Sequence, residues 1–477
     1  MIEPRVPPEH ARIASTIWWV LAGVAGLIAV AVSVFDLPRE LLGLLILALM
    51  LVLIMLGVPV AIAMASAATY GVFLSVGFRG LAFTLQEFPF RSSASWSLSV
   101  IPMFILMGFV VFRSGLSAQI YDAARAWLGG LPGGIAIATN FAGAGMAAAS
   151  GSSIGISYAL GHIAIPEMLR SGYDKRLATA VVAEAGTIGQ LIPPSILAVV
   201  YAGIAGTPIG TQLLAGLVPG ILLAFSYAII ILVWVQLRPI KSAANVQTSY
   251  TWPDRWRAAG RVWPLVLIIV AVVGGLYGGI FTATEAGAFG ALAAIILSWI
   301  TGGKDFGAKM LAALRDTVYA TTAIMFLLVS VSFLNRLLAV TNVAAWIAQR
   351  VGGLQLEALG FIGLMVVLYL ILGMFMDPVG MMLLTVPVFS PTLQALNIDM
   401  IWFGVFIVMM GEIAITSPPV GVQSFIIHQL CQEPGLLPEG EEIRLWDVFS
   451  GVLRFGIGDV AVVAILIAFP GVIYIFL

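Results

Sequence analysis

Long stretches of this chain carry almost no charged side chains, and this constrains its fold more than any other feature. No Asp, Glu, Lys or Arg occurs from 126 to 166, and Glu184 is the one charged residue from 177 to 237. Only 9% of the 477 residues are charged, whereas a soluble domain has about 25%. Because a membrane-spanning helix needs about 20 apolar residues, these stretches predict an all-α polytopic membrane protein.

The composition also excludes several function classes. The 22 Lys and Arg residues are balanced by 23 Asp and Glu residues, so the chain has no basic surface for nucleic acid. The single cysteine, Cys431, excludes an intrachain disulfide and a multi-cysteine metal site. A soluble enzyme is excluded by the low charge. We therefore expect a protein that is not an enzyme, with no catalytic residues, no organic cofactor and no transition metal.

Charge placement divides the chain into regions. Residues 1–40 are predicted to hold an extra N-terminal transmembrane helix, because the apolar run from Ile13 to Phe35 is too long for a signal peptide. Arg5 and Arg12 favour a cytoplasmic N-terminus. The basic segment 238–261 is predicted to be a cytoplasmic loop that joins two repeats, 41–237 and 262–477. The acidic segment 431–447 is compatible with an external position.

The two repeats share an order of landmarks. In the first, an apolar run reaches the polar tip Ser150–Ser153, and Pro193–Pro194 follows 43 residues after Ser150. In the second, an apolar run reaches Asp377–Gly380, and Pro418–Pro419 follows 41 residues after Asp377. Prolines remove backbone donors, and freed carbonyls at membrane depth are tolerated only where they line a cavity or bind an ion. Two such elements in matching positions indicate a transporter site near the midplane of the membrane.

This pattern predicts about a dozen spans and two re-entrant hairpins. The broken elements and the last helix are expected at these approximate ranges: hairpins at 131–168 and 354–396, interrupted helices at 177–208 and 401–430, and a final helix at 449–477.

Short motifs run in order through more than 400 residues. They are Leu56–Val60, Ile101–Gly108, Leu131–Gly134, Ser150–Ser153, Ile165–Met168, Ala185–Ser195, Thr282–Ala286, Met376–Pro378 and Ser417–Gly421. From about Leu41 to the C-terminus, the chain resembles the large membrane subunit of TRAP (tripartite ATP-independent periplasmic) transporters. The resemblance implies an inverted-repeat, elevator-type secondary transporter in the bacterial inner membrane.

The resemblance also implies partners and a coupling ion. A separate small four-helix membrane subunit is expected to pack against the scaffold. A periplasmic binding protein is expected to deliver an organic acid, such as a C4-dicarboxylate, sialic acid or a similar carboxylate, and a sodium gradient to drive its uptake. The chain departs from the family in three places: Ala283 replaces a common proline, Phe109 stands where an acid is frequent, and residues 1–40 are additional.

Sodium prefers oxygen ligands, and both predicted breaks offer them. Ser150 and Ser152 carry hydroxyl groups, and the prolines that follow Ile192 free backbone carbonyls. The resemblance implies one sodium site at Ser150, Ser152, Gly189, Ile192 and Pro194. Pseudo-symmetry suggests a second sodium site at Asp377, Gly380, Thr416, Ser417, Pro419 and Gly421.

An organic anion can be bound by helix N-termini, whose backbone amides carry partial positive charge. We expect Ser153, Ser195, Asp377 and Ser417 to contact it. No Lys or Arg occurs between Arg350 and Glu433, so bound sodium is expected to offset the charge of the substrate.

Other polar residues have less specific expectations. Glu184 and Glu412 either brace the interrupted helices or contact substrate, and the sequence does not decide between the two. Glu285 is expected in the scaffold, and His162 and His428 in ordinary polar packing.

Two other functions remain as alternatives. Asp459 completes a Gly-x-Gly-Asp motif, which intramembrane aspartyl proteases pair with a Tyr-Asp on a neighbouring span. The two Tyr-Asp pairs here, at Asp122 and Asp174, lie in polar segments predicted to be loops, so this reading is disfavoured. The second alternative is a passive channel, which needs a continuous polar path rather than two polar tips.

Overall fold

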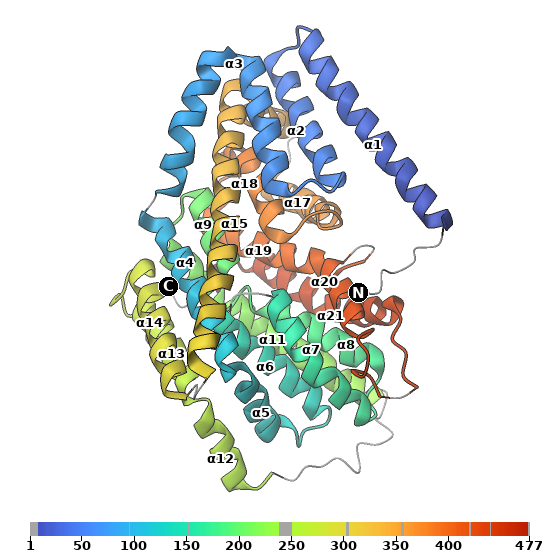
Figure 1. Ribbon diagram of the computed structural model, residues 1–477, viewed down its shortest axis with the longest axis vertical. Coiled ribbons are helices and arrows are strands. Elements are labelled where there is room, and N and C mark those ends of the chain that lie inside the picture. The colour runs from blue at the N-terminus through green and yellow to red at the C-terminus, as the bar shows by residue number, and fades with distance from the viewer. Residues whose placement is uncertain are drawn as a thin grey trace. The chain divides into compact units, whose positions relative to one another are not determined.

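The structure is a computed structural model that describes residues 8–94, 96–150, 153–237, 250–301, 305–353, 357–418, 421–438 and 440–475. Side-chain positions are described for all of these except 8–17, 92, 97, 116, 117, 147–150 and 352. Every regular element within these ranges is a helix (Figure 1). The all-α prediction is therefore confirmed.

The chain forms two compact units. The first comprises residues 1–95, 323–358 and 383–397. Its helices are α1 (Pro8–Val34), α2 (Arg39–Met55), α3 (Val60–Ser93), α16 (Val343–Gly353) and the C-terminal parts of α15 (Phe306–Thr341) and α18 (Pro378–Ala395). Within this unit α2 packs against α1, α3 and α16. Gly43 of α2 lies directly against Thr341 and Val343, so the absence of a side chain there lets the helices approach closely.

The second unit comprises residues 96–322, 359–382 and 398–477. Its N-terminal elements are η1 (Trp96–Ser99), α4 (Val100–Ser114), α5 (Leu116–Leu128), α6 (Gly134–Ser150), α7 (Ser153–Arg170), α8 (Lys175–Ile188), α9 (Ile196–Ala205), α10 (Ile209–Ala215) and α11 (Leu217–Leu237). Its C-terminal elements are α12 (Trp252–Arg261), α13 (Trp263–Tyr277), α14 (Ala283–Thr301), α17 (Ala358–Leu372), α19 (Met400–Thr416), α20 (Val422–Leu430), α21 (Leu445–Ala468) and η3 (Pro470–Tyr474). The first parts of α15 and α18 also belong here.

Helix α8 forms the centre of the second unit. It packs against α6, α7, α11 and α21 (Figure 1), and all of its residues from Leu177 to Ile188 are buried. Small side chains permit this close packing: Gly143 of α6, for example, lies against Ala185 of α8. A helix buried on every face is apolar all round, which explains why this stretch holds a single charged residue, Glu184.

Five described helices are long and apolar enough to cross a membrane, or up to seven if two bent helix pairs each count as one span. This is fewer than the dozen spans expected from the sequence. The physical reason is that many apolar stretches are divided into short helices, among them Ile196–Ala205, Ala358–Leu372 and Met400–Thr416. Single short helices of this length do not reach across the hydrocarbon layer.

Two segments that we expected to be loops are helical. Residues 252–261, in the basic segment, form α12, which Thr251 and Asp254 cap reciprocally; residues 238–249 lie outside the described ranges. The loop prediction for Tyr121 is also wrong, because Tyr121 is a buried residue of α5. In both cases a high density of charge on one helix face resembles a loop in the sequence.

Candidate functional site

The first predicted tip lies at the break between α6 and α7. Helix α6 ends at Ser150 and α7 begins at Ser153. Gly151, Ser152 and the side chain of Ser150 lie outside the described residues. The prediction that Ser150 and Ser152 bind sodium therefore stays a prediction. Ser153, a predicted substrate contact, is 4% exposed. Its hydroxyl donates a 2.7 Å hydrogen bond to Glu412 Oε2 of α19.

The sequence left open whether Glu412 braces the interrupted helices or contacts substrate, and the bond with Ser153 favours the bracing role. Glu412 is buried, and its carboxylate holds the first residue of α7 against α19. It therefore braces the broken elements in this structure. Because Ser153 and Glu412 lie 259 positions apart, the bond joins the predicted first hairpin to the predicted second interrupted helix.

The second break in the first repeat separates α8 from α9. The amide groups of Gly189 and Ile192 donate to the last turn of α8, while their own carbonyl oxygens accept no backbone hydrogen bond from any described residue. Pro193 and Pro194 cannot donate, so these carbonyls remain available to a cation. Ser195, a predicted substrate contact, accepts a hydrogen bond from the Ala198 amide and caps α9.

In the second repeat, Asp377 directly precedes α18. Its carboxylate accepts hydrogen bonds from the backbone of Val379 and Gly380, and its side chain is exposed on the described chain. The preceding turn lies on α19, because Gly373 contacts Ala414 and Pro378 contacts Gly411. Asp377 is thereby placed beside the helix that carries Glu412.

The fourth break separates α19 from α20. Helix α19 ends at Thr416 and is followed by Ser417, and Gly421, which directly precedes α20, has a φ of +48°. A side chain at Gly421 would meet the carbonyl oxygens of both Thr416 and Ser417 at 2.9 Å, so glycine is required for the turn. The Thr416 carbonyl accepts a 2.8 Å bond from Ser424 Oγ. Pro419, also a predicted sodium ligand, lies outside the described residues.

Buried hydrogen bonds connect the two repeats at their breaks. Gln423 Nε2 of α20 donates to Ser157 Oγ of α7 and to the Ala183 carbonyl of α8, each at 2.7 Å. A side chain at Gly186 of α8 would meet Ser157 Oγ and Gln423 Nε2 as well as the Ser153 carbonyl oxygen. The structure thus brings together α7, α8, α19 and α20, the elements predicted to contain the first hairpin and both interrupted helices.

Three further buried residues form a cluster that sequence reasoning did not assemble. The Tyr227 hydroxyl of α11 lies 3.0 Å from Glu184 Oε2 of α8 and 2.5 Å from Asp459 Oδ1 of α21. Tyr227 and the Gln423 contacts were missed because they bridge distant segments. The sequence signal that could have identified such residues is a polar side chain within an otherwise apolar, uncharged helix.

The structure pairs Asp459 with Tyr227 rather than with either of the aspartates considered for a protease dyad. Asp459 contacts Tyr227, whereas Asp174 caps α8 by accepting from the Arg176 amide. Asp122 lines a pocket of about 450 Å³ beside α12. The described contacts therefore do not join Asp459 to either Tyr-Asp pair.

Two other polar expectations can be compared with the structure. Glu285 caps α14 together with Thr282. His162 does more than pack: its Nε2 lies 2.9 Å from Glu433, which also accepts from the Tyr158 hydroxyl at 3.0 Å. The hydrogen bonds from His162 and Tyr158 hold the pKa of Glu433, which follows the end of α20, below its usual value.

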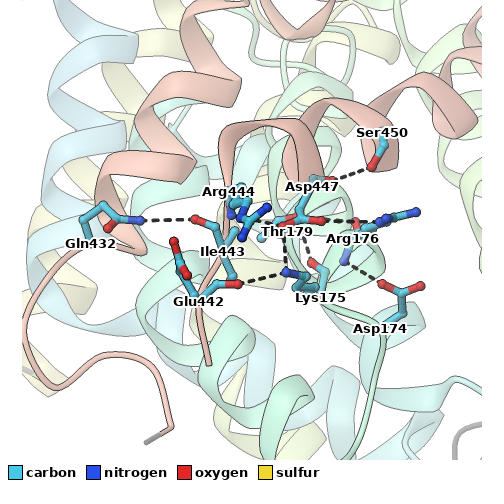
Figure 2. A network of polar contacts seen from close by, with 10 residues as sticks. All are labelled: Asp174, Lys175, Arg176, Thr179, Gln432, Glu442, Ile443, Arg444, Asp447 and Ser450. Carbon is cyan, nitrogen blue, oxygen red and sulfur yellow. Dashed lines mark hydrogen bonds and ion pairs between the residues drawn. The ribbon is translucent and has the colours of Figure 1, made fainter. Parts of the chain in front are cut away.

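A network of ions and hydrogen bonds fixes the first turn of α8 to the first turn of α21 (Figure 2). The Asp447 carboxylate is 2.8 Å from Lys175 Nζ and 3.4 Å from Arg176 Nε. Lys175 also donates to the Glu442 carbonyl at 2.9 Å. The Asp447 side chain is 8% exposed, so its charge depends on these partners.

We expect Asp447→Ala to lower the free energy of unfolding by about 1–2 kcal/mol, because it removes the carboxylate that Lys175 and Arg176 share. The loss stays moderate because Lys175 and Arg176 are each about one-third exposed and water screens them. Thermal unfolding in detergent measures the effect. Asp254→Ala is the matched control, because it breaks an exposed pair with Arg257 and the cap of α12, just as Asp447→Ala also removes the acceptor of the Arg444 amide at the start of α21. Equal losses in the two variants would contradict a special role for the Asp447 network.

A family model and several known proteins match most of the chain. The family model for the DctM component of tripartite ATP-independent periplasmic transporters matches residues 47–472. The C4-dicarboxylate TRAP transporter large permease protein DctM of Pseudomonas aeruginosa is 33% identical over 370 residues, 77% of this chain and 84% of the relative. The ectoine TRAP transporter large permease protein TeaC of Halomonas elongata is 29% identical over 407 residues, 85% of this chain and 92% of the relative.

Solved structures show a similar fold at low identity. The YdaH transporter of Alcanivorax borkumensis, described as having an unusual topology, matches with a TM-score of 0.63 and 14% identity over 83% of this chain and 91% of that one. MtrF of Neisseria gonorrhoeae matches with a TM-score of 0.56 and 12% identity over 88% of this chain and 94% of that one.

Proposed function

The chain belongs to the DctM family of TRAP transporter large permeases, and on that premise we propose that it imports an organic acid by sodium-coupled, elevator-type transport. It is a multi-pass protein of the bacterial inner membrane. The proposed partners are a separate small four-helix membrane subunit and a periplasmic binding protein that delivers the acid. The relatives are named for substrates that include C4-dicarboxylates and ectoine.

One observation carries this proposal: the helix breaks of the two repeats are joined by buried side-chain hydrogen bonds. The bonds from Ser153 to Glu412 and from Gln423 to Ser157 and Ala183 hold α7, α8, α19 and α20 as one packed group. A group held in this way can move as a body, which is what an elevator mechanism needs. The carbonyls of Gly189 and Ile192 offer oxygen ligands at one of these breaks.

The proposal can be tested with the complete transporter in proteoliposomes. The solute that co-purifies with the cognate binding protein is identified first, and its labelled form is then used as substrate. We expect uptake that requires the binding protein, the small subunit and an inward sodium gradient. Uptake that continues without a sodium gradient and without the binding protein would instead support a passive channel.

We expect Ser150→Ala to raise the sodium concentration that gives half-maximal uptake by about tenfold, the equivalent of about 1.4 kcal/mol for one lost ligand. Sodium titration of uptake measures the shift. Ser75→Ala is the control, because Ser75 lies in the first unit and donates only to the Gly71 carbonyl of its own helix. An unchanged sodium dependence in Ser150→Ala would remove this residue from the ligand set.

A further inference from the structure

The cluster of Glu184, Tyr227 and Asp459 lies deep in the second unit. The three side chains come from α8, α11 and α21 and are 1%, 0% and 3% exposed. Two carboxyl groups therefore share a site that water does not reach, separated by one phenol group. Buried carboxylates are costly unless they are paired or neutralised, so the cluster needs a source of compensation.

If both carboxyl groups were ionised, the cluster would have too few hydrogen atoms for the two close contacts of the Tyr227 hydroxyl. Tyr227 has one hydroxyl hydrogen and lies within hydrogen-bond distance of both carboxyl groups, 3.0 Å from Glu184 and 2.5 Å from Asp459. Ionised carboxylates only accept hydrogen bonds. If both acids were ionised, one of these two contacts would place two acceptors against each other. One additional hydrogen is required.

The geometry indicates where that hydrogen lies. The contact between Tyr227 and Asp459 has the short length typical of a hydroxyl that donates to an ionised carboxylate. The longer contact then has Glu184 as the donor to the Tyr227 oxygen. The Thr187 hydroxyl lies 3.4 Å from Glu184 Oε2 and 3.5 Å from the Tyr227 hydroxyl, but its single hydrogen has a shorter acceptor, the Glu184 backbone carbonyl at 2.8 Å. Glu184 Oε1 is buried without a hydrogen-bond partner among the described residues, a position that a neutral carbonyl oxygen tolerates far better than an anionic one.

Other charged and titratable groups on the neighbouring helices have described contacts of their own. On the helices packed against α8, α11 and α21, these include Glu412 with Ser153, Glu167 with Arg125, Tyr158 and His162 with Glu433, His428 with Ile443, Lys175 and Arg176 with Asp447, and Tyr474 with Asp399, while the guanidinium group of Arg454 lies over the Trp234 ring.

We propose that Glu184, Tyr227 and Asp459 form a proton-binding site, with one proton held on Glu184 at neutral pH. The bound proton completes a hydrogen-bond chain from Glu184 through Tyr227 to Asp459. This hydrogen-bond chain ties α8, which ends at the break before α9, to α11 and α21. A sodium ion is a poorer occupant, because it needs several oxygen ligands and the Tyr227 hydroxyl fills the space between the two carboxyl groups.

Infrared spectroscopy of the purified full-length protein tests this site directly, because a protonated carboxylic acid has a carbonyl band that a carboxylate lacks. Labelling with ¹³C-glutamate shifts bands from glutamic acids and leaves those from aspartic acids in place. Glu184 and Glu412 are the two buried glutamates among the described residues. The variants are therefore Glu184→Gln and, as the matched control, Glu412→Gln.

We expect a label-sensitive acid band at neutral pH that persists in Glu412→Gln and loses intensity in Glu184→Gln. If Glu184→Gln does not fold, labelled Glu412→Gln decides alone, because Glu184 is then the buried glutamate that remains. Absence of the band in labelled Glu412→Gln, or an unchanged band in Glu184→Gln, would overturn the proposal. A band that appears only after sodium is removed would overturn it too, since a cation would then occupy the site.

Discussion

Replacing Gly186 by alanine is expected to reduce transport to background and to lower the free energy of unfolding by about 1–3 kcal/mol, the usual cost of overpacking a core. A methyl group at this position would lie 2.6 Å from the Ser153 carbonyl oxygen, 2.6 Å from Ser157 Oγ and 2.7 Å from Gln423 Nε2. One of these atoms belongs to the backbone and cannot rotate away. The added carbon therefore separates α8 from α7 and α20 at the point where the two repeats are joined.

Gly363→Ala is the control for this prediction. Gly363 is also a helix residue of the second unit, and a methyl group there would meet no described atom within 4 Å. We expect this variant to retain transport and to unfold at the same temperature or slightly higher, since alanine favours helix more than glycine does. Uptake assays and thermal unfolding should be made on both variants. Normal uptake by Gly186→Ala would contradict the view that close contact of α7, α8 and α20 is needed for transport.

Much of the fold could be predicted because its causes are local. Stretches without charged residues are stable in lipid or in a buried core. In lipid, a helix satisfies the hydrogen bonds of its own backbone. Prolines act at their own position: Pro193 and Pro194 cannot donate, and α8 ends at Ile188 shortly before them. The family could also be predicted, because the order of short motifs is itself written in the sequence, and the match over 47–472 confirms it.

The partners of the polar side chains could not be predicted in the same way. Gln423 bonds Ser157 across 266 positions, and Tyr227 bonds Asp459 across 232. No local pattern specifies such distances, because they follow from how whole helices pack. Ser195 illustrates a different limit: its hydroxyl suits substrate binding as well as helix capping, and the structure shows it capping α9. The same residue type serves both purposes.

Replacing Asp377 by alanine is expected to abolish uptake while the protein still folds and inserts into the membrane. The Asp377 side chain is exposed beside α19 and supplies a carboxylate at the start of α18. No Lys or Arg occurs in this region of the sequence between Arg350 and Glu433, so a bound cation is the natural partner for this charge. Loss of the capping interaction alone should cost about 1 kcal/mol of stability, which is too little to unfold a protein of this size.

Asparagine at position 377 removes the negative charge but keeps the capping oxygen. Asp377→Asn keeps an oxygen that can accept from the Val379 and Gly380 backbone, so we expect wild-type thermal stability together with a strong loss of sodium-driven uptake. Asp399→Asn is the matched variant, because Asp399 caps α19 by accepting from the Trp402 amide at 2.8 Å and is not among the predicted ligands. We expect it to transport normally. Wild-type uptake by both Asp377 variants would remove this carboxylate from the site, whereas uptake by Asp377→Asn alone would show that capping, and not charge, is what transport requires.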